Sequence, residues 1–245
     1  MYHDNKYKKK GNRMSYFPFF REIEGEKCLV IGGGKVAARK ISRLKEFGVK
    51  IKVVAPSIVS DIEAMAQACD NISVERRIIT PQDIENADFV IAAAGEEADK
   101  EAARLCKERS IPVNVVDNQE LCDFIFPSII RKGDMVAGFV TGGKSPHVAA
   151  KIRRDCEMNI SDNIEDILDY LARIRKLAKD RISDERKRAA YIREVSEFCM
   201  KADRVCSNKE ENAFLQKYLD NRSETVLPPG GAGATKMHIY LLRLL

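Results

Sequence analysis

The chain has 245 residues, of which 44% are hydrophobic, so it is long enough to bury one large core or two smaller ones. Its 42 basic and 37 acidic residues are intermixed, and the resulting net charge of +5 does not by itself indicate nucleic-acid binding. The seven cysteines are scattered and form no CxxC pair, which excludes a disulfide scaffold or a structural zinc site and favours a reducing, cytoplasmic compartment.

Residues 1–14 are polar and basic, and we predict that they form a disordered arm. No apolar run that follows has the length of a signal peptide core or of the ~20 residues that cross a bilayer. A nucleic-acid role would rest only on Lys8, Lys9, Lys10 and Arg13 in this arm. We therefore expect neither a membrane nor a nucleic-acid partner.

Short apolar runs alternate with amphipathic runs from about residue 28 to residue 116. Strands are predicted at 27–31, 50–54, 72–76, 88–93 and 113–116, and helices at 36–47, 58–68 and 97–109. Gly48 follows the first of these helices and is a typical helix terminator. Strands joined by helices predict right-handed βαβ units, so we expect an α/β protein with a Rossmann-like parallel sheet in residues 15–117.

The pattern changes after residue 117. Two apolar runs at 124–130 and 135–141 flank a turn at 132–134, which predicts an antiparallel β-hairpin, and a helix is predicted from Pro146 to about Met158. Charged amphipathic helices at 161–206 predict an α-helical domain over residues 159–220. Residues 221–245 contain LPPGGAGA and are predicted to be a tail of unknown role.

The stretch VIGGGKVAARK (30–40) contains the spacing GxGxxA between a predicted strand and a predicted helix. In the dinucleotide-binding fingerprint, Gly32 permits the tight turn, Gly34 lets the backbone approach a pyrophosphate, and Ala37 lets the helix lie close to the strand. The helix N-terminus then offers N–H groups and a positive dipole end to the phosphates. The alternative is a tight turn that binds no ligand.

The second strand does not end in the acidic residue that usually holds the adenine ribose ~20 residues after such a motif. It ends instead at Pro56 and Ser57, and the Ser57 hydroxyl is a candidate partner for the ribose. No arginine or lysine follows directly to bind a 2′-phosphate. The sequence therefore favours NAD over NADP.

Two further strand ends are candidate site positions, because ligands of such sheets lie outside the carboxyl ends of the strands. Ala94 follows one strand and is small enough to let a cofactor lie close. Asn114 and Asp117 belong to NVVD (114–117) on the last strand, where Asp117 would be near the nicotinamide. The alternative for Asp117 is an ordinary turn residue, since Asp-Asn is good turn chemistry.

The loop TGGKSP (141–146) precedes the next predicted helix. Ser145 fits the N-cap and Pro146 the first helical position, so the helix end can hold an anion with Lys144 beside it. Arg153 and Arg154 lie two turns along the same helix. The alternative is an ordinary capped helix with a solvated basic face.

Six segments together resemble one family. YFPFF (16–20), VIGGGKVAARK (30–40), VVAPS (53–57), NVVD (114–117), FIFPSII (124–130) and TGGKSPHVAAKIRR (141–154) occur in order and at fitting distances. They are similar to the precorrin-2 dehydrogenases, or sirohydrochlorin synthases, including the dehydrogenase/ferrochelatase part of the siroheme synthases. The resemblance covers residues 15–157. It implies a homodimeric, NAD-dependent oxidoreductase that oxidises precorrin-2 to sirohydrochlorin, with residues 118–158 as a dimerisation and substrate region.

The resemblance also implies roles for single residues. The family's catalytic aspartate falls on Asp117, and a residue of its tetrapyrrole pocket falls on Thr141. Together with the motif positions, the candidate cofactor residues are Gly32, Gly33, Gly34, Lys35, Val36, Ala37, Pro56, Ser57, Ala94 and Asn114. The candidate substrate residues are Thr141, Lys144, Ser145, Arg153 and Arg154, because precorrin-2 is a polycarboxylate that basic groups would hold through charge-assisted hydrogen bonds.

Two alternatives stay open from the sequence. Some family members also insert Fe²⁺ into sirohydrochlorin, and His147 is a weak candidate ligand in a chain that otherwise shows no metal motif. A Rossmann domain can also serve as an NAD(H)-sensing module without chemistry of its own. Such a module would need the glycine turn but neither Asp117 nor the basic helix after Ser145, so their joint presence favours an enzyme.

Overall fold

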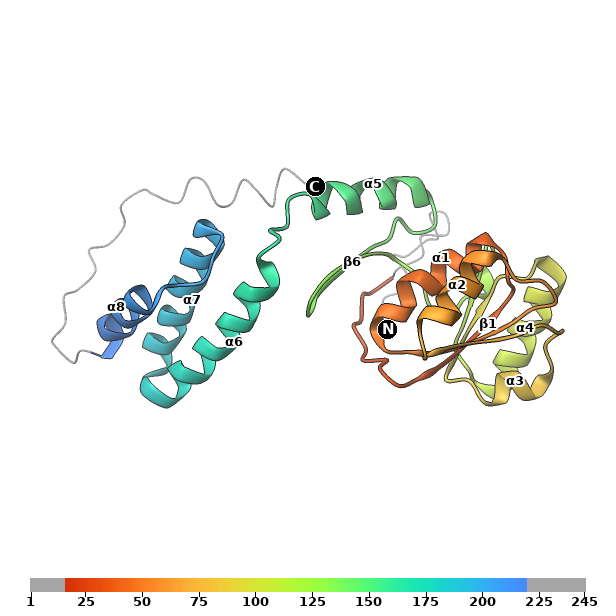
Figure 1. Ribbon diagram of the computed structural model, residues 1–245, viewed down its shortest axis with the longest axis horizontal. Helices are drawn as coiled ribbons and strands as arrows, with labels where there is room; N and C mark the ends of the chain where they lie inside the picture. Colours follow the sequence, from red (N-terminus) through yellow and green to blue (C-terminus); the bar gives the residue numbers. More distant parts are fainter. Residues whose placement is uncertain (1–15, 220–245) are drawn as a thin grey trace, which may run out of the picture. The chain divides into compact units, whose positions relative to one another are not determined.

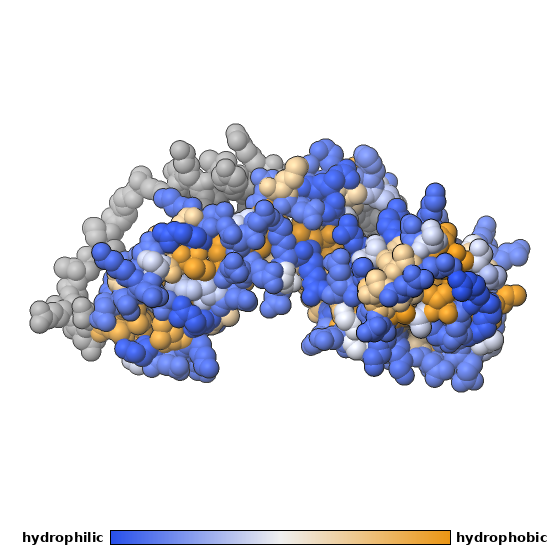
Figure 2. Space-filling view, viewed as in Figure 1, coloured by the Kyte–Doolittle hydropathy of each residue, from blue (hydrophilic) through white to orange (hydrophobic). Residues whose placement is uncertain are grey.

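The computed structural model describes residues 16–219, so the predicted arm (1–14) and the predicted tail (221–245) lie outside the described residues. The chain divides into two compact units, which meet between Ile160 and Ser161. In the view of Figure 2 the surface of both units is mostly hydrophilic, with apolar patches on each. This agrees with the high proportion of charged residues in the sequence.

A five-stranded parallel sheet forms the centre of the first unit. Its order is β3-β2-β1-β4-β5, so consecutive strands run outwards in one direction from β1 and then, after a crossover, in the other. The strands are β1 (Lys27–Ile31), β2 (Lys50–Val54), β3 (Ile72–Glu75), β4 (Phe89–Ala92) and β5 (Val113–Val115). The order reverses between β1 and β4, and the carboxyl ends of strands at such a switch point are where open α/β sheets bind ligands.

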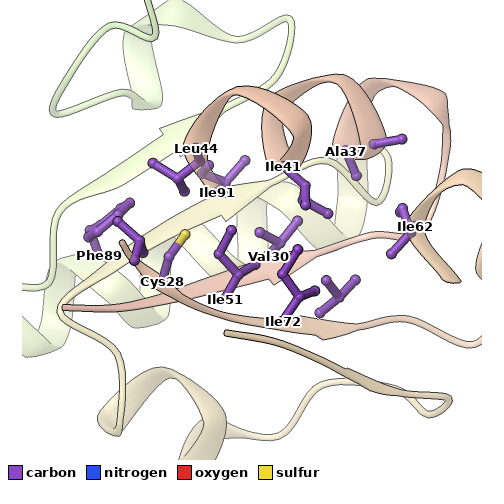
Figure 3. Packing of buried hydrophobic residues seen from close by; sticks show 13 residues of the cluster. Cys28, Val30, Ala37, Ile41, Leu44, Ile51, Ile62, Ile72, Phe89 and Ile91 are labelled. Atoms are coloured by element: carbon purple, nitrogen blue, oxygen red, sulfur yellow. The ribbon is translucent and has the colours of Figure 1, made fainter. Parts of the chain in front are cut away.

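Helices cover both faces of this sheet (Figure 1). On one face are α1 (Lys35–Leu44), continued by a 3₁₀ turn at Lys45–Phe47, and α2 (Ser60–Ala68); on the other are α3 (Pro81–Glu85) and α4 (Glu96–Arg109). Figure 3 shows how α1 packs: Ile41 and Leu44 lie on Val30 and Ile91 of the sheet. Burial of each such side chain contributes about 1.5–3 kcal/mol, so this face fixes the position of the turn that precedes α1.

The parallel Rossmann-like architecture predicted from the sequence is confirmed. β1 and β2 have the predicted bounds, and the other strands differ by one or two residues at their ends. Gly48 ends the first helical segment in the left-handed conformation, with φ +68°. The five-residue α3 was not predicted, because its apolar periodicity is too short to detect; Thr80 and Asp83 form a capping box that starts it.

The first unit also contains the predicted hairpin and helix. The hairpin consists of β6 (Ser128–Lys132) and β7 (Met135–Phe139), and α5 (Pro146–Glu157) follows. The first strand was predicted to begin at residue 124 but begins at Ser128. Pro127 has no N–H to give to a strand ladder, and Phe124 and Phe126 pack instead against the core below α1.

The second unit is helical, as predicted. α6 (Ile164–Arg181), α7 (Glu185–Ala202) and α8 (Asn208–Leu219) pack around a core that includes Tyr191 and Val195. α8 lies beyond residues 161–206, where the helical pattern was recognised, but within the predicted helical domain. Its apolar face is short, which explains why the periodicity did not show it.

Candidate active site

Three glycines follow β1, and they differ in what surrounds them. Gly32 has φ +115°, and a Cβ on it would lie 2.2 Å from the carbonyl oxygen of Ala93. A Cβ on Gly33 would lie 2.1 Å from the carbonyl oxygen of Ser57. Within the described chain, a Cβ on Gly34 would meet no atom within 4 Å. The protein backbone thus excludes side chains at the first two positions, whereas the space beside the third is open to a ligand.

The N-terminus of α1 borders this open space. Gly34 is its N-cap, no side chain caps the helix there, and its first turn contains no acidic residue. Lys35 and Val36 are exposed, while Ala37 is fully buried against the sheet. Uncapped N–H groups and the positive end of the helix dipole are suited to a pyrophosphate, so these residues fit the phosphates of a dinucleotide.

The loop after β2 lies directly beside the glycine turn. The backbone N–H of Val59 donates to the carbonyl of Gly33 over 2.9 Å. Pro56 and Ser57 are exposed on this loop. The structure therefore brings these two candidate cofactor residues to the edge of the open space, where an adenosine attached to the pyrophosphate would extend.

A buried carboxylate shapes the loop after β4. Asp99, only 4% exposed, accepts hydrogen bonds from the backbone N–H groups of Ala94 (2.8 Å) and Gly95 (3.3 Å). Burial raises the pKa of Asp99 above its usual value, and the two N–H donors partly offset this. Asp99 was not identified from the sequence, although an acidic residue in the first turn after Gly95 is a recognisable cap signal.

Asp117 follows β5 in a strained turn. Its φ is +59°, and it is one of three non-glycine residues in the described chain whose φ is positive. Its side chain is exposed. The left-handed conformation costs a non-glycine residue of order 1 kcal/mol or more, and such residues are enriched at functional sites. The backbone N–H of Val116 donates to the carbonyl of Ala92 (2.9 Å), which anchors this turn to the end of β4.

Lys40 forms a buried connection beneath this turn. Its ammonium donates to the Oδ1 of Asn114 over 2.9 Å and lies 4.4 Å from the centre of the Phe126 ring. Burial lowers the pKa of Lys40 to about 8, against the opposing influence of nearby Cys122 and Asp117. The Asn114 amide also donates to the carbonyl of Phe124 (2.9 Å), so both ends of this side chain are engaged within the protein.

The engagement of Asn114 changes its expected role. It was proposed as a cofactor contact from its place on the strand, but it is 5% exposed and its amide is saturated by protein groups. Its side chain holds Lys40 and the segment at Phe124 in this structure, and its contact with a cofactor stays a prediction. Lys40 belongs to the glycine motif itself, yet its role could not be predicted from the sequence, because no local pattern shows which strand a helix residue faces.

The TGGKSP loop is held by its own hydroxyl groups. The Thr141 hydroxyl accepts from the N–H of Ser145 (3.2 Å) and donates to its carbonyl (2.9 Å), and the Ser145 hydroxyl accepts from the N–H of Val148 (3.2 Å). Ser145 is thus the predicted N-cap of α5. A Cβ on Gly143 would lie 2.1 Å from the Oε1 of Gln119, so this loop packs against the residues that follow Asp117.

The basic candidates of α5 have different surroundings. Arg153 is partly buried and pairs with Glu157 one turn later, whereas Lys144 and Arg154 are exposed. His147 is also exposed, and no three His, Cys, Asp or Glu side chains within residues 16–219 are grouped so that they could hold a metal ion. No helix in the same range is long and apolar enough to cross a membrane.

Comparison of the sequence with known proteins gives three findings. Residues 19–128 match a family model described as "Putative NAD(P)-binding". The chain is 34% identical to the siroheme synthase of Thioalkalivibrio sulfidiphilus over 221 residues, which cover 90% of this chain and 44% of that protein. It is 31% identical to the siroheme synthase of Nitrosococcus oceani over 201 residues, or 82% of this chain and 42% of that protein.

A solved structure titled SirC, precorrin-2 dehydrogenase, has a similar fold. The TM-score is 0.63 at 20% identity, and the match covers 83% of this chain and 98% of that one. The chain spans less than half the length of the siroheme synthases that it matches. The sequence relationship thus extends over nearly all of this chain, and the structural likeness extends beyond the Rossmann sheet.

Proposed function

The chain belongs to the siroheme synthase family, and on this premise we propose that it oxidises precorrin-2 to sirohydrochlorin with NAD. The observation that carries this proposal is the pairing of an open glycine turn after β1 with a strained aspartate after β5. A dinucleotide site alone would need the first feature and not the second.

The cofactor would lie along the carboxyl ends of the strands. The turn Gly32–Ala37 and the N-terminus of α1 would hold the pyrophosphate, and Pro56 and Ser57 would border the adenosine. NAD is favoured over NADP because no arginine or lysine directly follows Pro56 and Ser57, where a 2′-phosphate on the adenine ribose would lie.

The bound nicotinamide supplies a hydride acceptor. The oxidation removes one hydride and one proton from the tetrapyrrole, so a group beside the acceptor must receive or direct the proton. We assign this role to Asp117, whose carboxylate is exposed on a turn that the β4 and β5 ends hold in place. Proton transfer of this kind typically contributes about 10²–10⁴ in rate.

The substrate is a polycarboxylate, and the basic groups around the TGGKSP loop suit it. Lys144 and Arg154 are exposed, and Arg153 lies on the same helix. Thr141 and Ser145 hold the loop in shape through their hydroxyl groups. The loop packs on Gln119, close in sequence to Asp117, so these groups would hold carboxylate arms while the ring lies at the reactive end of the cofactor.

We further propose that the protein is a cytoplasmic homodimer. Phe17, Phe19 and Phe20 are 75%, 85% and 73% exposed, and Val148 and Ile152 are exposed on α5. Large apolar side chains with this degree of exposure are typical of surfaces that another protein covers. Light scattering coupled to gel filtration would test this; a monomeric mass at micromolar concentration would contradict it.

The function is tested in an anaerobic assay with enzymatically prepared precorrin-2 and NAD, in which NADH and sirohydrochlorin are followed by absorbance. We expect NAD-dependent formation of sirohydrochlorin. Asp117→Asn should lower kcat by about 10²–10⁴ and leave the Kd for NAD unchanged. Wild-type protein that binds NAD without turnover would instead indicate a sensing module. Addition of Fe²⁺ to the product then measures metal insertion, the alternative in which the chain also acts as a ferrochelatase.

A further inference from the structure

A cavity of about 360 Å³ lies within the first unit, between α1, the β6–β7 hairpin and α5. Its volume is at the lower end of the range for small-molecule sites. The sequence motifs pointed to single residues of this cavity but not to the cavity itself. Residues of α1, of the segment before β6, of the hairpin, of the TGGKSP loop and of α5 line it.

The charged side chains that line this cavity are all cationic. Four of the lining residues are cationic, namely Arg39, Lys40, Arg43 and Arg153, and no aspartate or glutamate from the described part of the chain lines it. Arg153 pairs with Glu157 outside the lining, and Lys40 bonds to the neutral amide of Asn114. The cavity therefore holds more positive charge than its own surroundings neutralise.

Arg39 and Arg43 carry this argument further. They are one helical turn apart on α1, and each is exposed with no carboxylate of residues 16–219 within ion-pair distance. Like charges spaced by four residues destabilise a helix by about 0.2–0.5 kcal/mol. Lys40 between them adds a third cation to the same end of the helix. Such unpaired charges converging on a concave surface fit an anionic ligand with more than one charge.

The walls between these cations are apolar. Phe126, whose ring lies under the Lys40 ammonium, lines the cavity together with Phe139 and Ile129. An apolar wall beside charged groups suits a ligand whose acidic arms are attached to a ring system. An inorganic anion would make little use of these aromatic side chains.

The cavity is also connected to the candidate active site. Lys40 reaches from the cavity to Asn114 on β5, three residues before Asp117. Thr141 and Gly143 line the cavity, and Gly143 packs against Gln119, two residues after Asp117. An arm held in the cavity would thus belong to a molecule that extends towards the Asp117 turn.

We propose that Arg39, Lys40, Arg43 and Arg153 form a carboxylate subsite that holds acidic arms of the tetrapyrrole while its ring lies at Asp117. This inference rests on the proposed function and adds three residues of α1 to the groups on α5. The helix that begins at the glycine turn would then contact the cofactor with its first residues and the substrate with its later ones.

The test compares Arg39→Gln/Arg43→Gln with the wild type. Glutamine has nearly the helix propensity of arginine, so α1 is expected to persist, and a thermal melt checks this. Arg175→Gln/Arg193→Gln removes the same charge from exposed positions on α6 and α7 and is the matched control. Binding of sirohydrochlorin is followed by absorbance titration without NAD, and kcat and KM are then measured with precorrin-2.

We expect the Kd for sirohydrochlorin to rise at least about tenfold in Arg39→Gln/Arg43→Gln, with the KM for NAD unchanged. The control pair should bind as the wild type does, and Arg39→Lys/Arg43→Lys, which keeps the charge, should retain most of the affinity. If the wild type turns over precorrin-2 but the glutamine variant binds sirohydrochlorin with an unchanged Kd, the subsite alone is overturned. Charge-dependent binding without any turnover would support the subsite and refute the dehydrogenase, and absence of sirohydrochlorin binding would overturn both.

Discussion

Alanine substitutions at the three glycines after β1 can be compared, and only one of them, Gly34→Ala, should weaken NAD binding without destabilising the fold. Gly34→Ala places a methyl group where the described chain has no atom within 4 Å, at an extended φ of −88° that alanine adopts freely. Loss of unfolded-state entropy stabilises the variant by about 0.4–1 kcal/mol, and the poorer N-cap offsets this by a similar amount. The melting temperature should therefore stay within a few degrees of the wild-type value.

The same methyl group should weaken cofactor binding. It would project into the space where the pyrophosphate approaches the N-terminus of α1, and at least one charge-assisted hydrogen bond would be lost or lengthened. At about 1.5–3 kcal/mol for each such bond, the Kd for NAD should rise by about tenfold to a hundredfold. Isothermal titration calorimetry measures the Kd directly.

Gly32→Ala and Gly33→Ala are the matched controls. Their methyl groups would lie 2.2 Å and 2.1 Å from backbone oxygens, and Gly32 adds the strain of φ +115°. We expect a loss of about 3 kcal/mol or more in each, which corresponds to about 6–12 °C for a chain of this size. Wild-type affinity for NAD in Gly34→Ala would refute the proposed position of the pyrophosphate, and a melting temperature as low as that of Gly32→Ala would refute the open space.

Three further predictions concern charge and burial. The folded chain releases the Lys40 proton near pH 8, whereas the unfolded chain releases it near 10.5. The free energy of unfolding of the wild type, relative to that of Lys40→Met, should therefore rise between about pH 8 and 10, by at most about 3 kcal/mol. A difference that stays constant with pH in urea unfolding would contradict this. Arg77 holds the pKa of buried Asp83 well below its usual value, so Asp83→Asn should cost about 3 kcal/mol at neutral pH, and the cost should shrink as the pH falls below about 4, where the unfolded wild-type carboxylate takes up its proton first. The Tyr191 hydroxyl is buried without a hydrogen-bond partner in the described chain, so Tyr191→Phe should stabilise the protein by about 1 kcal/mol in thermal or urea unfolding, and a clear loss of stability would show that the hydroxyl is satisfied.

The features that the sequence predicted best are those that depend on neighbouring residues. The alternation of strands and helices, the helix end at Gly48 and the N-cap at Ser145 all agree with the structure. Each depends on hydrophobic periodicity or on the conformation of one or two residues, and both are local properties. Where the local pattern was short, as in α3, or was interrupted, as at Pro127, the prediction failed.

The tertiary structure decided which of these local features meet. Lys40 and Asn114 are 74 residues apart, yet they share a hydrogen bond because β1, β4 and β5 are neighbours in the sheet and α1 packs on β1 and β4. In the same way, Gly143 packs on Gln119, and Arg39 and Arg43 face a cavity closed by the hairpin. Periodicity shows that a helix has a buried face and an exposed one, but strand order and packing determine what lies opposite each face. The sequence alone therefore determined the Rossmann domain and its glycine turn, and only the packing of distant segments decided which residues surround Asp117.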